Sequence, residues 1–396
     1  MKLLISSCAR LFKDDDGCYY TPIVYDYSFY ERYLRIFEEI CVVGFCEKIS
    51  NNQKNTLLKV SGPRLSVFEV PFPHGEWDYI RKRRLIIKSL KNCCDNCDAA
   101  LLRVPETLCF LIMDVLIEKK IPWAVEVVAD PINLYTRQSC TSKYRLIYKY
   151  WYYWLQKRAC YLANGTSYVT KNELQKRYPP KVSINNFTTN YTDTNIKISK
   201  DEKARKLSKN RRIRLIHVAT YLNGYAKGHK ETIEAFISLL KDKIDVELTL
   251  IGNGSLLPDV LNIINFHNCS NRINYTGKIP FNSVIEELRK ADIFVFPSYN
   301  EGLPRVVIEA MSVGLPIVAS DIPAHRELLS PCYLVPVRNS HEIYVKIKQL
   351  ILSSNEYILA SQDNLERAKN YDIDIIQDKR DEFYQNLKNL AMLNKK

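Results

Sequence analysis

Short apolar runs alternate with amphipathic stretches along the whole chain. In the first half, the runs that predict β-strands cover residues 2–6, 40–45, 66–71, 99–104, 124–129 and 167–170. In the second half they cover residues 214–220, 247–251, 273–276, 293–297, 317–320 and 333–337. Nearly continuous apolar strands separated by helical patterns are typical of parallel sheets that are covered on both faces. The pattern therefore predicts an α/β protein with two Rossmann-like parallel-sheet domains.

A polar stretch separates the two series of strands. Residues 191–212 are rich in charge and lack periodicity, which predicts an exposed linker. We therefore expect an N-terminal domain over residues 1–190, a C-terminal domain over 213–375 and a final helix over 376–396, which could return to the N-terminal domain. Ligands of such sheets bind at the carboxyl ends of the strands, so the site is expected in a cleft where the two domains face each other.

Composition narrows the class of protein. Hydrophobic residues make up 46% and charged residues 26% of the 396 residues, as in ordinary globular proteins. No apolar run approaches the 18 or more residues that span a bilayer, and the apolar start is too short for a signal peptide. We expect a cytoplasmic protein with reduced cysteines. Cys93, Cys94 and Cys97 are interpreted as surface thiols in a helix-to-strand turn, not as a zinc site.

The most informative segment runs from Glu301 to Asp321 and predicts a loop, a helix and a strand. Pro304 lies where the helix would start, and the unpaired amides of a helix start suit a phosphate group. Glu301 and Glu309 are eight residues apart, which is about 12 Å along a helix. That spacing exceeds the roughly 5–9.5 Å of a glycosidase carboxylate pair. It predicts two separate clamps on the hydroxyls of one long ligand.

This segment closely resembles the E-x7-E signature of family 4 retaining glycosyltransferases, which are enzymes of the GT-B fold. The flanking elements Phe296-Pro-Ser298, Glu301-Gly-Leu-Pro304 and Glu309-Ala-Met-Ser312 match as well. The resemblance is strong over residues 213–340 and mainly architectural over the first 185. It implies a metal-independent hexosyltransferase that uses a nucleotide-sugar donor and needs no cofactor.

The resemblance also implies roles for individual residues. Glu301 would hold hydroxyls of the donor sugar, and Glu309 would hold the ribose. Lys227, which Gly228 follows, would stabilise the departing diphosphate, because that charge needs fixed positive groups. The donor-binding candidates are Glu309, Gly302, Leu303, Pro304, Arg305, Gly252, Gly254, Lys278 and Ile279.

Two regions depart from the family pattern. Relatives carry an arginine about five residues before the lysine, and here residues 221–224 read Tyr-Leu-Asn-Gly, so Arg305 is the candidate replacement. In the first half, Ser-Ser-Cys-Ala-Arg over residues 6–10 replaces a glycine-rich loop. Asp130 follows a strand after which many relatives have a histidine. It is either a contact for sugar or acceptor or a turn-forming residue before Pro131.

Metal and nucleic acid are not expected. Asp-x-Asp occurs at residues 14–16 and 372–374, but neither directly follows an apolar strand, so both are interpreted as solvated charge. No nucleic-acid motif accompanies the formal net charge of +13. The charge is uneven, because residues 1–190 carry 28 basic against 19 acidic residues and the remainder carries 29 against 25. The more basic half is expected to face an anionic surface.

Residues 143–158, KYRLIYKYWYYWLQKR, contain five cations, no acid and seven aromatic residues. A basic, aromatic amphipathic helix suits an anionic membrane surface, and Lys143, Arg145, Lys149, Trp151 and Trp154 are its candidates. The alternative is an internal helix whose aromatic rings pack in the N-terminal core.

Together these observations predict a retaining glycosyltransferase that acts on a growing polysaccharide or a lipid-linked oligosaccharide at the cytoplasmic membrane face, as a peripheral protein. Two alternatives stay open. A sugar-nucleotide epimerase or phosphorylase would share the GT-B fold. A non-catalytic basic protein that binds membranes would explain the charge but not the paired glutamates.

Overall fold

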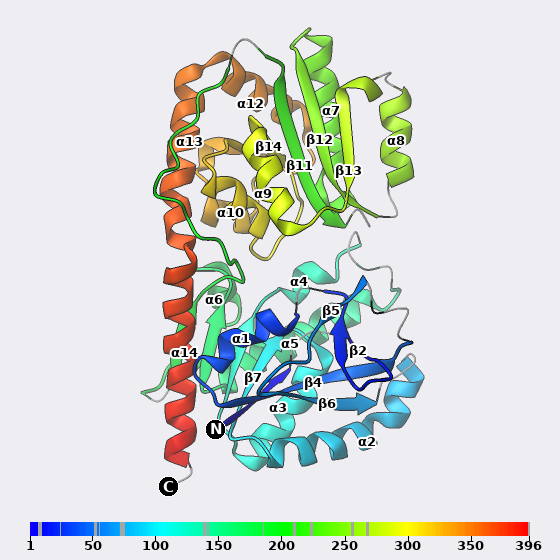
Figure 1. The fold of residues 1–396 in the computed structure, drawn as a ribbon, viewed down its shortest axis with the longest axis vertical. Coiled ribbons are helices and arrows are strands. Elements are labelled where there is room, and N and C mark those ends of the chain that lie inside the picture. The colour runs from blue at the N-terminus through cyan, green and yellow to red at the C-terminus, as the bar shows by residue number, and fades with distance from the viewer. Residues whose placement is uncertain are drawn as a thin grey trace. The chain divides into compact units, whose positions relative to one another are not determined.

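The computed structural model describes the chain except for residues 7–9, 24, 51–53, 55, 72–75, 138–139, 141, 185, 209–210, 222–224, 255–256, 267–268 and 395–396. The chain forms two compact units (Figure 1). Unit 1 comprises Met1–Ile132, Leu146–Tyr191 and Gln377–Lys396, and unit 2 comprises Asn133–Arg145 and Thr192–Ile376. Each unit has its own sheet and its own hydrophobic core.

Over its described residues, unit 1 holds a ten-stranded sheet in the order β10-β9-β8-β7-β1-β4-β2-β3-β5, and β6 also pairs with β4. The pairs from β10 to β4 are parallel, while β3 is antiparallel to both β2 and β5. The strands are β1 (Lys2–Ser6), β2 (Leu11–Lys13), β3 (Tyr19–Thr21), β4 (Glu39–Lys48), β5 (Leu58–Lys59), β6 (Leu65–Pro71), β7 (Ala99–Val104), β8 (Trp123–Val127), β9 (Gly165–Tyr168) and β10 (Phe187–Asn190).

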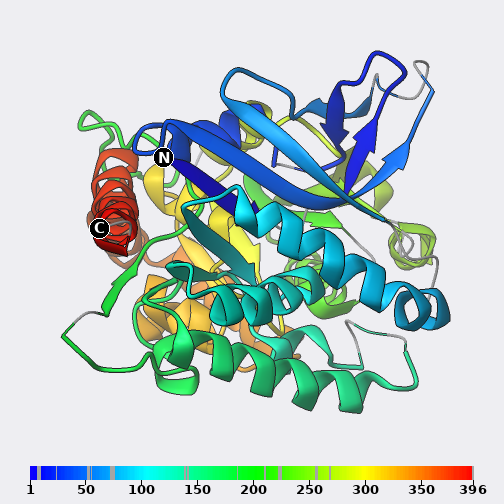
Figure 2. The ribbon, with the colours of Figure 1, turned by 90° about the horizontal axis from the view of Figure 1, so that it is seen from below.

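Helices cover both faces of this sheet. Figure 2 shows α2, α3 and α5 side by side, and their apolar residues form one core with the strands. On the other face, α1 meets the end of α14, where the rings of Tyr33 and Tyr384 lie 4.9 Å apart. The helices are α1 (Tyr27–Leu34), α2 (Glu76–Asp95), α3 (Thr107–Lys119), α4 (Pro131–Leu134), α5 (Arg145–Leu162), α6 (Glu173–Arg177) and α14 (Ile373–Asn394), of which α4, α5 and α14 cross the unit boundary.

Unit 2 contains a parallel sheet in the order β13-β12-β11-β14-β15-β16 with a core on each face. Its strands are β11 (Ile213–Tyr221), β12 (Val246–Asn253), β13 (Ile273–Gly277), β14 (Ile293–Phe296), β15 (Ile317–Ser320) and β16 (Leu334–Val335). Its helices are α7 (His229–Lys241), α8 (Leu257–Phe266), α9 (Phe281–Lys290), α10 (Arg305–Ser312), α11 (Pro323–Leu328), α12 (Ser340–Leu352) and α13 (Ser354–Ala368). Its 3₁₀ turns are η2 (Tyr225–Lys227), η3 (Ser270–Arg272), η4 (Pro331–Tyr333) and η5 (Lys369–Tyr371).

The prediction of two Rossmann-like parallel sheets is confirmed. Each predicted apolar run lies on a strand, because strands buried on both faces must be apolar along their length, as β7 and β8 are. The small antiparallel addition β2–β3–β5 was not predicted, since its strands are only two or three residues long.

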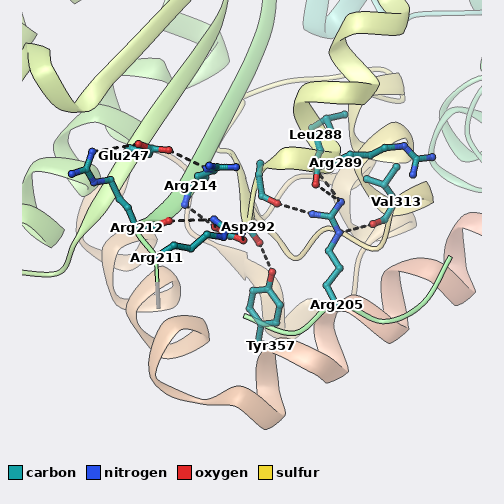
Figure 3. Close-up of polar contacts among 11 residues, drawn as sticks. Arg205, Arg211, Arg212, Arg214, Glu247, Leu288, Arg289, Asp292, Val313 and Tyr357 are labelled. Carbon is teal, nitrogen blue, oxygen red and sulfur yellow. Dashed lines mark hydrogen bonds and ion pairs between the residues drawn. The ribbon is translucent and has the colours of Figure 1, made fainter. Parts of the chain in front are cut away.

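The expected exposed linker packs instead against unit 2. Ile196 is buried, and the Arg205 guanidinium donates hydrogen bonds to main-chain carbonyls of other segments (Figure 3). These acceptors are Val313 at 2.8 Å, Ala291 at 2.6 Å, Arg289 at 3.1 Å and Leu288 at 3.4 Å. Arg211 forms a two-pronged pair with Asp292 at 2.6 and 2.7 Å. The sequence looked like a linker because these arginines satisfy carbonyls and carboxylates that only the fold brings near.

Both sheets share one topological feature that positions ligands. The first strand of each is central, so the chain proceeds from it in opposite directions along the sheet. The order reverses between β1 and β7 in unit 1 and between β11 and β14 in unit 2. In open parallel sheets, ligands bind beyond the carboxyl ends of the strands at such a switch point.

Candidate active site

Lys227 and Glu301 meet at the switch point of unit 2. Lys227 ends the turn η2 after β11, and Glu301 lies in the loop after β14. The Lys227 Nζ atom lies 2.7 Å from Glu301 Oε1, and the Ser298 hydroxyl donates to the same oxygen at 2.6 Å. Because Oε1 is engaged twice, the other carboxylate oxygen is the one placed to accept a hydroxyl of a ligand.

Buried polar groups behind this pair fix the two loops. Tyr299 N–H donates to the carbonyl of Ala226 at 2.8 Å, which joins the loop after β14 to η2. The Ser320 hydroxyl donates to the Ser298 carbonyl, and His325 Nδ1 lies 2.7 Å from the Ser320 carbonyl. Burial lowers the pKa of His325, so its ring is neutral and Nδ1–H is the donor. The sequence analysis assigned no role to these residues, although Ser298 and Ser320 follow apolar strand patterns directly.

Two glycines allow close approach of the loops after β11 and β12. Gly228 has φ +72°, and a Cβ atom there would lie 2.2 Å from the Pro297 carbonyl oxygen. Gly252 has φ +142°, and a Cβ atom there would lie 1.8 Å from the Ala219 carbonyl oxygen. These glycines are therefore required by main-chain packing at the strand ends. Contact of Gly252 with a nucleotide stays a prediction.

Glu309 lies on α10 and is only 5% exposed. Burial raises the pKa of its carboxyl to about 7, and the charge of Arg305, an exposed residue, opposes the shift. Pro304 precedes the first residue of α10 as its N-cap, and Gly302 and Leu303 lie half-buried before it. A buried carboxylate without an ion pair beside a helix start is a group that a ligand hydroxyl would stabilise.

The remaining donor candidates are more scattered. Lys278 and Ile279 follow β13, the edge strand of the unit 2 sheet. Lys278 is exposed, whereas Ile279 packs partly against one of the unit 2 cores. The N–H of Gly254 donates to the Asn253 side chain at 2.8 Å. The loop in which relatives carry their arginine falls largely on residues 222–224, outside the described part of the chain.

Asp130 has a structural role, which corrects its candidacy as a contact for sugar or acceptor. The residue is 4% exposed, and its carboxylate accepts hydrogen bonds from the Tyr178 hydroxyl at 2.6 Å and from the Ile132 N–H at 2.9 Å. It also forms an ion pair with Arg177. All of these partners fix the start of α4 and the end of α6, and Asp130 is not carried further as a ligand contact.

The Asp-x-Asp patterns and the cysteines also differ from expectation. Asp14 is buried and accepts from the Cys18 N–H, and Asp372 accepts from the Ile198 N–H, so both aspartates support local turns. Cys93 is buried in α2, 3.9 Å from the sulfur of Cys41, and is no surface thiol. Within the described residues, no group of three or more His, Cys, Asp or Glu side chains is placed to hold a metal ion.

The membrane candidates lie on or just before α5. Trp151 is 61% exposed, Trp154 62% and Ile147 59%, so these three side chains do not pack in the core. Tyr152 and Tyr153 pack against it instead. Lys143 is exposed, and Arg145 and Lys149 are half-buried. Over the described residues, no helix is long and apolar enough to cross a bilayer.

Comparison with known proteins agrees with this geometry. Residues 212–353 match the family model described as glycosyl transferases group 1. Sucrose-phosphate synthase from Thermosynechococcus elongatus superposes with a TM-score of 0.69 at 14% identity, over 98% of this chain and 100% of that one. HepE from Anabaena, solved with UDP and glucose, gives 0.65 at 14% identity over 100% of both chains. The chain has the GT-B fold.

Sequence similarity to curated proteins is uneven along the chain. Protein CapJ of Staphylococcus aureus is 25% identical over 381 residues, covering 94% of this chain and 92% of CapJ. N,N'-diacetylbacillosaminyl-diphospho-undecaprenol alpha-1,3-N-acetylgalactosaminyltransferase of Campylobacter jejuni is 32% identical over 153 residues, only 38% of this chain and 39% of that protein. Together with the family match, these similarities support a GT-B glycosyltransferase of group 1.

Proposed function

We propose that this protein is a metal-independent, retaining glycosyltransferase that transfers a sugar from a nucleotide-sugar donor to a polysaccharide or lipid-linked oligosaccharide. The observation that carries the proposal is the Lys227–Glu301 pair at the β11/β14 switch point. A fixed cation, a carboxylate with one unoccupied oxygen and the start of α10 together suit a diphosphate attached to a sugar.

Each group has a distinct task in this proposal. Glu301 accepts hydrogen bonds from hydroxyls of the donor sugar, while Glu309 accepts them from the ribose. Lys227 and the main-chain amides of Gly302 and Leu303 stabilise the negative charge that develops as the diphosphate leaves. Lys227 keeps Glu301 charged and oriented until the donor arrives, since the two are ion-paired without it.

Retention of configuration follows from attack on the face that the diphosphate leaves. The bond from the anomeric carbon to the phosphate oxygen breaks as the bond to the acceptor oxygen forms. The acceptor's hydroxyl proton passes to the departing phosphate oxygen. The charge contacts named above stabilise that phosphate, so no protein nucleophile is required.

Relatives guide the choice of substrates to test. HepE was solved with UDP and glucose, and the Campylobacter relative is named for a diphospho-undecaprenol acceptor. We therefore propose a UDP-sugar donor as the first to test and a lipid-linked or polymeric glycan as the acceptor class.

Incubation with a panel of UDP-, GDP- and TDP-sugars tests the proposal through the release of nucleoside diphosphate. Release from one donor, unchanged by EDTA, and an α-linked product from an α-linked donor are expected. Interconversion of the sugar without release would favour the epimerase alternative, and release by inorganic phosphate would favour a phosphorylase. No release from any donor would contradict the proposal.

We also propose that the exposed face of α5 binds anionic phospholipid headgroups and so brings the enzyme to lipid-linked acceptors. Trp151 and Trp154 suit the headgroup depth of a bilayer. Cations lie among these rings, with Lys157 Nζ 5.3 Å from the Trp154 ring centre and Lys149 Nζ 6.0 Å from that of Tyr150. A protein partner would be bound as well by uncharged apolar residues, whereas the interleaved cations favour anionic lipid.

Flotation with phosphatidylcholine vesicles, with and without phosphatidylglycerol, tests this surface. Binding should require the anionic lipid and weaken with salt, because exposed charges are screened beyond about 10 Å at 0.1 M. Replacement of Lys143, Arg145 and Lys149 by glutamine, or of Trp151 and Trp154 by serine, should weaken binding. Leu359→Ser is the control, since that side chain is 58% exposed on α13. Equal binding by all variants would contradict the proposal.

A further inference from the structure

The β1/β7 boundary is the switch point of unit 1, as β11/β14 is that of unit 2. β1 ends at Ser6, which pairs with Leu102 of β7, and β7 ends two residues before Glu106. Side chains just beyond these two strand ends therefore lie where an open parallel sheet binds its ligand.

Glu106 is a carboxylate at this edge without a cationic partner among the described residues. It is the N-cap residue of α3, yet its side chain does not cap the helix. The Cys109 thiol donates to Oε2 over 3.8 Å, and no charged group contributes to its pKa, which burial raises to about 7. A carboxylate kept half-buried with so little compensation costs folding free energy, which is common at binding sites.

Ser6 is the second polar group at this edge. It is fully buried, and its hydroxyl has no hydrogen-bond partner among the described residues. The Cys109 sulfur lies 3.6 Å from the Ser6 carbonyl oxygen and 3.8 Å from Glu106 Oε2. One buried thiol thus contacts both residues, which places Ser6 and Glu106 in the same small region.

We propose that Glu106, together with Ser6, binds the sugar of the acceptor, with the Glu106 carboxylate accepting a hydrogen bond from a hydroxyl of that sugar. This inference rests on the proposed function and names a residue for its acceptor side. A carboxylate without a neighbouring cation repels phosphate, so the ligand here is a neutral sugar. A diphosphate that links an acceptor to its lipid lies elsewhere.

Direct binding of simple glycosides tests the inference without turnover. The probes are octyl β-glucoside, β-galactoside and N-acetyl-β-glucosaminide below their micellar concentrations, titrated without nucleotide and followed by NMR. Glu106→Gln should weaken binding at least about tenfold, which corresponds to one hydrogen bond to a charged group. Ser6→Ala, which removes a neutral hydrogen bond, should weaken it about two- to tenfold.

The matched control is Glu118→Gln on the same helix. Its side chain is 59% exposed and pairs with Lys91, so the same chemical change should leave glycoside binding unaltered. Unfolding midpoints of both variants exclude a general loss of structure.

UDP titration separates this inference from the proposed function. If Glu106→Gln loses glycoside binding while its affinity for UDP equals that of the wild type, both stand. If the wild type binds glycosides through Glu106 but releases no nucleotide from any donor, the proposed function fails and the sugar site stands. Wild-type glycoside binding by Glu106→Gln, or no glycoside binding by the wild type, overturns the inference.

Discussion

The two switch points carry opposite charge arrangements on similar sheets. In unit 2, Lys227 faces Glu301 beside a helix start, so positive groups are concentrated where β11 and β14 end. In unit 1, the cations near the strand ends neutralise other carboxylates, since Arg177 pairs with Asp130 and Arg103 with Glu126. Glu106 is left without such a partner among the described residues.

This difference separates two kinds of ligand on one architecture. A leaving diphosphate needs fixed positive charge, which the unit 2 switch point supplies. A neutral sugar hydroxyl needs an acceptor oxygen, which the unit 1 switch point supplies. The same topology thus serves donor chemistry in one unit and acceptor chemistry in the other, and the charges distinguish them. Four substitutions test that contrast.

The largest effect is expected for Arg103→Met in unit 1. Arg103 is 1% and Glu126 2% exposed, and Glu126 also accepts from the hydroxyls of Tyr191 and Tyr384. Loss of the cation leaves a buried charge uncompensated, so the free energy of unfolding should fall by about 3–5 kcal/mol. Urea unfolding followed by tryptophan fluorescence reports it, because all four tryptophans belong to unit 1.

That substitution should leave the affinity of the folded protein for UDP unchanged, because the charges at the ends of β7 and β8 are structural. A small loss of stability, below about 1 kcal/mol, would place this pair among those of little net worth. A loss of UDP affinity would blur the division between the units.

The second effect concerns Glu309 and the dependence of stability on pH. Burial raises the pKa of Glu309 in the folded state from 4.5 to about 7, so the folded state holds the proton more tightly than the unfolded state. Its contribution to stability is therefore fully present below pH 4.5 and is lost as pH rises toward 7. At pH 8 the cost is on the order of 3 kcal/mol, at about 1.36 kcal/mol per pKa unit.

Glu309→Gln should therefore raise the thermal midpoint of the ligand-free protein at pH 8 and leave it nearly unchanged at pH 4. Glu106 contributes a slope of the same sign, so part of the pH dependence remains in the variant. Glu301→Gln is the control and should gain no stability at pH 8, because its carboxylate is paired with Lys227. Equal gains in both variants would contradict the contrast between the two glutamates.

The sequence predicted the unit 2 site well because its determinants are local. Glu301, Pro304 and Glu309 belong to one continuous segment, and the strand before it is a plain apolar run. Unit 1 depends on contacts between distant residues. The partner of Asp130 is Arg177, 47 positions away, and nothing near Asp130 in the sequence indicates that pair.

The same reasoning explains the other differences from expectation. Residues 191–212 are polar because Arg205 and Arg211 bond to carbonyls and carboxylates about 80 to 110 residues away, as far as Val313. Glu106 escaped notice because its significance lies in what is absent around it. Aromatic residues of α5 divide between core and surface, and helical spacing placed Ile147, Trp151 and Trp154 together but could not decide which face is exposed.

The third effect is catalytic. Lys227→Ala should lower turnover about a hundredfold or more, which is the scale of losing one preorganised charge contact. Its folded structure should persist, since the side chain is one-third exposed. Lys230→Ala is the control, because Lys230 lies three residues on and pairs only with Glu234 on the surface of α7. Wild-type turnover in Lys227→Ala would remove the assigned role in leaving-group stabilisation.

The smallest effect distinguishes the two glutamates by what they bind. Glu309→Ala should weaken binding of free UDP, because a ribose clamp acts whether or not a sugar is attached. Glu301→Ala should bind UDP almost normally and lose turnover, because its contact is with the transferred sugar. One hydrogen bond to a charged group is worth about 1.5–3 kcal/mol, so calorimetric titration should show UDP affinities that differ about tenfold or more. The buried, unpaired state of Glu309 works against this difference, because removing it also relieves the cost of its burial in the free protein. A clear loss of affinity in Glu309→Ala would therefore mean that the ribose contact outweighs that relief, and equal affinities in the two variants would show that the roles are assigned wrongly.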